Sequence, residues 1–104
     1  MKEITVEELK QKIDQQEDFQ LIDVREEFEY ETSNLDGENI PLAEILLEKD
    51  KISRDKPVVI HCRSGKRSAQ AILLLEKEGY TNLANLQGGI LAWKETFDPS
   101  MPVY

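Results

Sequence analysis

Cysteine and histidine are scarce in this sequence of 104 residues, which contains one of each, Cys62 and His61. A lone cysteine cannot close an internal disulfide, and one cysteine with one histidine cannot supply the ligands of a Cys-based zinc site, so we expect no metal and no other cofactor. The two residues are adjacent, and neighbouring residues of a strand point to opposite faces. We therefore predict that His61 is structural and is not the base of a protease-like Cys–His pair.

Long apolar runs are also missing, since none approaches the ~20 residues that a membrane-spanning helix needs. The first eight residues, Met1–Glu8, are rich in acids, whereas a secretory signal peptide is apolar in its central part. We therefore expect no membrane contact and a cytoplasmic location, where a reducing environment keeps the cysteine as a thiol. The length suits a single domain, residues 1–104, with one hydrophobic core.

Positive charge is in the minority, and the formal net charge is −8. This argues against nucleic acid as a partner, because a protein that binds the phosphate backbone needs a basic face. Residues 1–50 hold 16 acidic and 5 basic side chains, a net charge of −11, whereas residues 51–104 hold 5 acidic and 8 basic ones, a net charge of +3. Three of those eight bases follow Cys62 within five residues. A small positive region in an acidic protein favours a small anionic substrate.

The most informative stretch is Val58–Ala69, which reads as strand, loop and helix. Residues 57–60 are apolar without polar alternation, as in a strand buried on both faces. Residues 68–78 carry good helix formers and end at Gly79, a typical helix stop. Cys62 is therefore expected at the carboxyl end of a strand, the edge of a parallel sheet at which ligands bind.

The loop after Cys62 contains Gly65, which can adopt backbone angles closed to other residues, and the cations Arg63, Lys66 and Arg67. The partial positive charge of the helix amino end and these cations both favour thiolate, so we expect the pKa of the thiol to fall by about a unit or more from its usual value of about 8.5. The simpler alternative is a basic turn beside an inert buried thiol.

The rest of the chain alternates strands and helices, which predicts an α/β fold with a mostly parallel central sheet and helices on both faces. Charge follows the first strand at Asp23 and Arg25, which we expect to brace the loops of the site structurally. The other predicted elements are a capped helix from Thr5 to near Gln15; a strand over 19–24; a short helix over 26–32 with Phe28 facing inward; a helix over 42–47 with Ala43, Ile45, Leu46 and Leu47 in the core; packing of Ala69, Ile72, Leu73 and Leu75 on the sheet; a strand over 82–86; and a helix over 90–96 with Trp93 in the core.

Three stretches together resemble the rhodanese (sulfurtransferase) family. Residues 62–67, Cys-Arg-Ser-Gly-Lys-Arg, look like its six-residue active loop, while residues 21–30 and 86–93 are similar to its early and late signatures, in the same order and spacing. The chain departs from the family at residues 33–35, Ser-Asn-Leu, where Gly-His-Ile is common, and at Glu38, where a small residue is usual. We expect these departures to change local packing and not the reaction.

The resemblance implies a single rhodanese domain and a two-step sulfur transfer. Cys62 would take a sulfur atom from a small anionic donor such as thiosulfate as a persulfide, and cyanide, a thiol or a thioredoxin-like protein would accept it. The backbone of Ser64 and Gly65 would stabilise the sulfur, Arg63, Lys66 and Arg67 would attract the donor, and Arg67 is the first choice to hold its oxygens.

Two other readings remain. Cysteine phosphatases and arsenate reductases use a Cys-x5-Arg loop, but Arg67 comes one residue too early for that motif, and the shorter loop suits a single sulfur atom better than a phosphate. The other is a catalytically idle rhodanese-like module that binds a protein, or a persulfide carrier to a protein partner; idle modules usually lack the cysteine or the basic loop.

Overall fold

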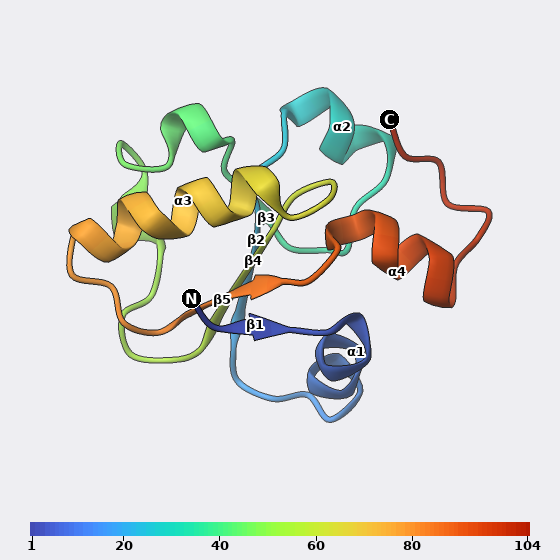
Figure 1. Ribbon diagram of the computed structural model, residues 1–104, viewed down its shortest axis with the longest axis horizontal. Coiled ribbons are helices and arrows are strands. Elements are labelled where there is room, and N and C mark those ends of the chain that lie inside the picture. Colours follow the sequence, from blue (N-terminus) through green and yellow to red (C-terminus); the bar gives the residue numbers. More distant parts are fainter.

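The computed structural model describes all residues 1–104 and shows one parallel sheet of five strands (Figure 1). The strands lie in the order β1-β5-β4-β2-β3, and every neighbouring pair is parallel. Their bounds are β1 Glu3–Ile4, β2 Gln20–Asp23, β3 Glu38–Asn39, β4 Val58–His61 and β5 Leu83–Leu86. The predicted α/β class with a mostly parallel sheet is thereby confirmed.

Helices cover both faces of the sheet, as predicted. The α-helices are α1 Val6–Asp14, α2 Glu27–Thr32, α3 Lys66–Lys77 and α4 Gly89–Phe97, and two 3-10 turns are η1 Leu42–Glu44 and η2 Lys49–Lys51. Successive residues of β4 point to the helix layers on opposite faces of the sheet. Ile60 packs with α3 and η1, whereas Val59 packs with α1 and α4. Figure 1 shows α3 and α1 on opposite sides of the strands. None of these helices is long and apolar enough to cross a membrane.

The predicted start of α1 is confirmed in atomic detail. The Glu8 N–H donates to Thr5 Oγ1 at 3.1 Å, and the Thr5 N–H donates to Glu8 Oε1 at 3.0 Å. This reciprocal capping box satisfies two backbone donors that would otherwise lack partners at the helix start. The central strand β4 is buried at all four positions, which explains its uninterrupted apolar run before His61.

The predicted inward position of Phe28 is wrong. Its side chain is 56% exposed, and Glu29 is the buried residue of α2. The Glu29 carboxylate accepts the Glu26 N–H at 3.0 Å, which caps the start of this short helix. Because consecutive helical residues are turned by about 100°, the inward orientation of Glu29 directs Phe28 toward the surface.

The predicted helix over 42–47 is also wrong, because only a 3-10 turn forms at Leu42–Glu44. Of the expected core stripe only Ile45 is buried, whereas Leu47 is 83% exposed and Ala43 and Leu46 are exposed too. A single 3-10 turn is too short to repeat an apolar face, so of these four side chains only that of Ile45, directly after the turn, is buried. On α3, Ile72 and Leu75 pack inward as predicted, but Leu73 is exposed and Ala69 is only partly buried.

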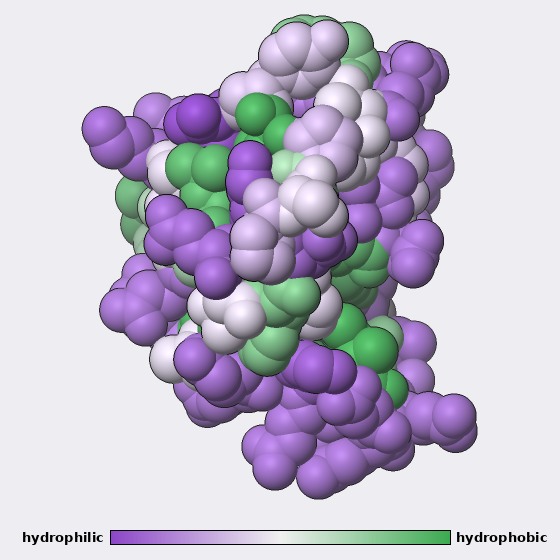
Figure 2. Space-filling view, turned by 90° about the vertical axis from the view of Figure 1, so that its right-hand side faces the viewer, coloured by the Kyte–Doolittle hydropathy of each residue, from purple (hydrophilic) through white to green (hydrophobic).

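The predicted core position of Trp93 is correct only in part, because its side chain is partly buried and packs against the α1/α4 layer. Trp93 borders an open groove that α1 and residues 34–38 also line. At the α4 end, apolar areas are separated from one another by hydrophilic side chains (Figure 2).

Candidate active site

Cys62 follows β4 directly, and α3 begins four residues later at Lys66. The cysteine therefore lies at the carboxyl edge of the central strand of the sheet, as the first residue of the loop that joins β4 to α3. Its side chain is only 1% exposed and packs in the α3 layer beside Ile60. Gly65 ends the loop with a φ of +113°, a left-handed conformation that few side chains tolerate.

The thiol of Cys62 lies among hydrogen-bond donors. The Gly65 N–H donates to Sγ at 3.1 Å, and the Ser68 hydroxyl lies 3.4 Å from Sγ. Burial by itself raises the pKa of the Cys62 thiol, but hydrogen bonds from the Ser68 side chain and from the backbone of Ser68, Gly65 and Ser64 outweigh it, and the net pKa is lowered. The direction agrees with the sequence prediction, but the pKa is lowered by hydrogen bonds rather than by the loop cations.

Further hydrogen bonds connect this loop and the start of α3 to β5. The Ser68 hydroxyl donates to Asn85 Oδ1 at 2.6 Å, and the Asn85 side-chain amide donates to the Gly65 carbonyl at 3.1 Å. Ser68 and Asn85 are both buried. Sequence analysis missed these two residues as members of the site, because a serine in a helix and an asparagine in a strand give no local signal of a contact 17 residues apart.

The three loop cations have different surroundings. Arg67 donates from its two terminal nitrogens to the two carboxylate oxygens of Glu29, at 2.7 and 3.0 Å. Arg63 donates from Nε to the backbone carbonyl of Tyr104, and the Tyr104 ring packs edge-on against Phe28 with ring centroids 5.3 Å apart. Lys66 is exposed and makes no ion pair. The C-terminal segment therefore lies beside the loop and holds one of its cations.

Asp23 and Arg25 form a buried ion pair. The Arg25 Nη2 donates to Asp23 Oδ2 at 2.7 Å and to the Ser33 carbonyl at 2.9 Å. These contacts connect the end of β2 with Ser33, the residue that follows α2. His61 is fully buried next to this pair, with Nε2 3.7 Å from Asp23 Oδ2 and Nδ1 3.3 Å from the Cys62 carbonyl. Burial lowers the pKa of His61, which favours its neutral form.

The amino end of α4 packs directly on the cysteine loop. The Ile90 N–H donates to the Cys62 carbonyl at 3.0 Å, and the Leu91 N–H donates to the Arg63 carbonyl at 3.1 Å. This approach requires a glycine at position 89, where φ is +60° and an added Cβ would lie 2.5 Å from the Arg63 carbonyl oxygen. The Gly-Gly pair predicted as a tight turn thus also lets α4 close against the loop.

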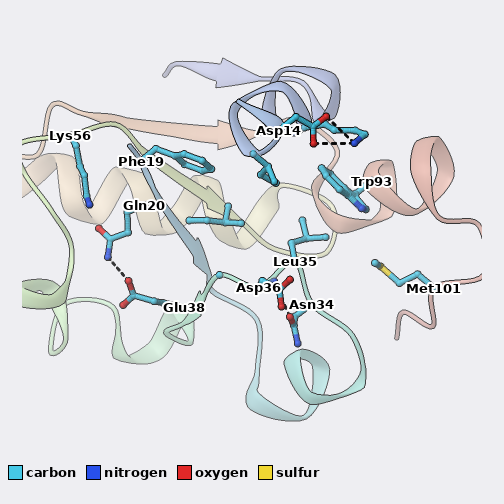
Figure 3. A pocket seen from close by; sticks show the side chains of 14 residues that line it. Asp14, Phe19, Gln20, Asn34, Leu35, Asp36, Glu38, Lys56, Trp93 and Met101 are labelled. Atoms are coloured by element: carbon cyan, nitrogen blue, oxygen red, sulfur yellow. Dashed lines mark hydrogen bonds and ion pairs between the residues drawn. The ribbon is translucent and has the colours of Figure 1, made fainter. Parts of the chain in front are cut away.

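The largest cavity of the chain, with a volume of about 580 Å³, lies away from the cysteine loop. It is formed by α1, the start of β2, the segment 34–38, Trp93 and Met101 (Figure 3). None of residues 62–67 lines it. This cavity is therefore separate from the thiol, whose hydrogen-bond partners come from the loop and the start of α3.

These features define a class of protein, a parallel α/β domain with a buried cysteine in a strand–loop–helix cradle. A family model described as a rhodanese-like domain matches residues 5–96. The chain therefore belongs to the rhodanese-like family, as its three motifs indicated.

Relatives of this chain include proteins named for sulfur transfer. A sulfurtransferase of Allochromatium vinosum is 40% identical over 92 residues, which cover 88% of this chain and 86% of the relative. The putative sulfurtransferase YtwF of Bacillus subtilis is 34% identical over 100 residues, 95% of this chain and 96% of the relative. The probable adenylyltransferase/sulfurtransferase MoeZ of Mycobacterium tuberculosis is 33% identical over 104 residues, but the match spans only 26% of its length. Some relatives therefore match this chain along most of their length, whereas in MoeZ the match is one part of a much longer protein.

Solved structures agree with this assignment. A rhodanese-related protein from Thermoplasma volcanium has a TM-score of 0.79 and 31% identity, over 100% of this chain and 98% of that chain. A rhodanese-like domain protein from Staphylococcus aureus has a TM-score of 0.84 and 30% identity, over 100% and 99%. The predicted single rhodanese-like domain is thereby confirmed.

Proposed function

We propose that the protein is a thiosulfate sulfurtransferase that carries sulfur as a persulfide on Cys62. The observation that supports this most is the surroundings of Sγ, which accepts a hydrogen bond from the Gly65 N–H at 3.1 Å and lies 3.4 Å from the Ser68 hydroxyl. Both groups can stabilise a thiolate, and after the transfer the backbone N–H groups of the loop can stabilise the charged outer sulfur of a persulfide. A cysteine that served only in packing would not need them.

The reaction proceeds in two balanced steps. The Cys62 thiolate attacks the outer sulfur of thiosulfate, the sulfur–sulfur bond of the donor breaks, and sulfite leaves with the electron pair. The outer sulfur of the resulting persulfide carries the negative charge. Cyanide or a thiolate then attacks that sulfur, the persulfide bond breaks, and the Cys62 thiolate is restored. No oxidant or reductant is consumed in either half-reaction when cyanide is the acceptor.

The loop cations capture the donor. Arginine has five N–H donors, of which Arg67 gives two to Glu29, so three remain for the oxygens of thiosulfate. Lys66 and Arg63 add positive charge at the entrance, and Ser64 and Gly65 contribute backbone N–H groups. Asp23 and Arg25 form a buried ion pair at the end of β2, the strand next to β4, and so support the loop structurally. No group in this scheme requires a metal or cofactor.

The acceptor in the cell is proposed to be a thiol, either small or on a thioredoxin-like protein, in the cytoplasm. A relative named putative sulfur carrier protein YrkF, from Bacillus subtilis, is 35% identical over 92 residues and is matched over 50% of its length. It makes a carrier role a second candidate, in which Cys62 passes its sulfur to a protein. The cradle around Cys62 argues against an idle binding module.

Thiocyanate formation from thiosulfate and cyanide tests this proposal. The wild-type protein is expected to form thiocyanate. Cys62→Ser, which replaces the nucleophilic sulfur with a smaller hydroxyl oxygen, is expected to lose all activity while keeping its circular dichroism spectrum and melting temperature. Turnover that survives Cys62→Ser, or a folded wild-type protein that forms no thiocyanate, overturns the thiosulfate sulfurtransferase proposal.

A further inference from the structure

Asn85 accepts a hydrogen bond from the Ser68 hydroxyl, the same group that can donate to the Cys62 thiolate. Asn85 is only 3% exposed and lies in β5 opposite Ile60, on the same side of the sheet as Cys62. The Ser68 hydroxyl lies between the two groups, 2.6 Å from Asn85 Oδ1 and 3.4 Å from Cys62 Sγ. A serine hydroxyl has a single proton, so it can donate to only one of them at a time.

The orientation of the Asn85 amide is fixed by the loop. Its nitrogen lies 3.1 Å from the Gly65 carbonyl, which can only accept a hydrogen bond, so this atom must be the NH2 group. The amide oxygen therefore faces Ser68 and can only accept. The short distance of 2.6 Å indicates that the Ser68 proton lies toward Asn85.

When Cys62 is a neutral thiol, every acceptor in this chain of three residues has a donor. The S–H group can donate to Ser68, and the Ser68 hydroxyl can donate to Asn85. When Cys62 ionises, the thiolate can only accept, and Ser68 can serve it only by turning away from Asn85. The Asn85 oxygen would then be left buried without a donor, which is costly. In the persulfide the sulfur bound to Cβ is uncharged, so Ser68 can return to Asn85.

We propose that Asn85 is a positioning residue that competes with the Cys62 thiolate for the single Ser68 proton, and so opposes ionisation of the thiol and favours the sulfur-loaded state. The proposal rests on the proposed function in one respect, the role of the Cys62 thiolate as nucleophile. A thiolate that is less well stabilised is also more nucleophilic, since nucleophilicity rises with the pKa of the thiol. Asn85 thus lowers the fraction of Cys62 that is thiolate at low pH and raises the reactivity of each thiolate that forms.

The pH dependence of iodoacetamide alkylation of Cys62 tests this competition in the full-length protein, without any sulfur donor. Asn85→Leu keeps the shape of the side chain and removes the acceptor, so Ser68 is free to donate to the thiolate. We expect the alkylation pKa to fall by about half a pH unit or more, with a lower plateau rate at high pH. Ser68→Ala is expected to raise the pKa instead.

The double variant Ser68→Ala/Asn85→Leu distinguishes competition for the Ser68 proton from a structural role of Asn85, in which its amide only holds the Gly65 carbonyl. If Asn85 acts through the Ser68 proton, the effect of Asn85→Leu on the pKa disappears once Ser68 is alanine. A pKa that rises with Asn85→Leu, or that shifts equally in both backgrounds, overturns the proposal and assigns Asn85 to bracing of the Gly65 carbonyl. If Asn85→Leu does not fold, Asn85→Ala removes the same acceptor and is judged by the same outcomes.

The charged and ionisable groups around the loop are common to all these variants: Arg63, Lys66, Arg67, Glu29, Asp23, Arg25 and His61. Asn82→Leu is the matched control, because this asparagine precedes β5 and donates to the Ser53 and Lys56 carbonyls away from the thiol. It is expected to leave the alkylation pKa unchanged. Failure of the thiosulfate assay with the expected order of alkylation pKa values rejects only the sulfur-transfer proposal, whereas normal turnover with the wrong order rejects only the role of Asn85.

Discussion

Arg67 and Glu29 form a two-point ion pair between the cysteine loop and α2, with distances of 2.7 and 3.0 Å between their nitrogen and oxygen atoms. Glu29 is buried, while Arg67 is about one third exposed. The parallel fork of the guanidinium fixes the plane of Arg67 and leaves its other N–H groups available. Glu29 is therefore the residue that orients the last cation of the loop.

The first prediction concerns capture of the donor. Arg67→Ala is expected to raise the KM for thiosulfate about tenfold, equivalent to about 1.4 kcal/mol, because three oriented N–H donors and a positive charge are lost. Lys77→Ala at the far end of α3 is the control, since this lysine belongs to the same helix but lies outside the loop. Steady-state thiocyanate assays at several thiosulfate concentrations measure both variants. An unchanged KM in Arg67→Ala removes Arg67 from donor binding.

The second prediction concerns the pH dependence of stability. The hydrogen bond from Arg67 is the main cause that lowers the native pKa of Glu29 below its ordinary value of 4.5. A lowered native pKa means that the unfolded state binds the proton first as the pH falls, so the stability from Glu29 is complete above pH 4.5 and is lost as the pH falls through the native pKa.

Urea denaturation of the wild type and of Glu29→Gln, which cannot titrate, measures this contribution. The wild type is expected to be more stable near neutral pH, and the difference in unfolding free energy between the two proteins is expected to shrink below pH 4.5. A difference that grows as the pH falls contradicts the ion pair as its source.

The third prediction concerns the buried pair behind the loop. Arg25→Met leaves the Asp23 carboxylate buried without its partner and is expected to reduce the free energy of unfolding by about 3–5 kcal/mol. Lys10→Met breaks the exposed pair with Asp14 on α1 and is expected to cost no more than about 0.5 kcal/mol. Denaturation curves of the two variants test the contrast. Equal losses would show that burial of the Asp23–Arg25 pair has no special weight.

The fourth prediction concerns the contact of α4 with the loop. The matched control is Gly79→Ala, which introduces a side chain at a φ of +92° with its nearest neighbour 3.5 Å away. It is expected to reduce the free energy of unfolding by about 1–2 kcal/mol through backbone strain alone. Gly89→Ala adds a clash with the Arg63 carbonyl and is expected to lose about 1–3 kcal/mol more and to slow thiocyanate formation. Similar stability of the two variants would contradict a close approach at Gly89.

The strand, loop and helix around Cys62 could be predicted from the sequence because their signals are local. The apolar run of β4, the glycine in the loop and the helix formers of α3 lie next to one another in the chain. The partners of the loop could not be predicted in this way. Glu29, Asn85 and Tyr104 approach it from α2, β5 and the C-terminal segment, and their contacts depend on the folded arrangement.

The errors in the core have a physical origin as well. The apolar pattern predicted a full helix at residues 42–47, but the helical geometry stops after the 3-10 turn at Leu42–Glu44, and beyond it Ile45 is buried while Leu47 is exposed. At α2 the assumption that the aromatic residue faces inward failed, because the pairing of Glu29 with Arg67 decides which side of this short helix is buried. Hydrophobicity alone could not predict that a carboxylate would take that place.

Intact-mass spectrometry after incubation with thiosulfate tests the central claim most directly, because it observes the proposed persulfide itself. The account predicts a gain of one sulfur atom located at Cys62, absent in Cys62→Ser, and removed by cyanide with release of an equal amount of thiocyanate. A folded protein that gains no sulfur, or that gains it equally in Cys62→Ser, contradicts the account.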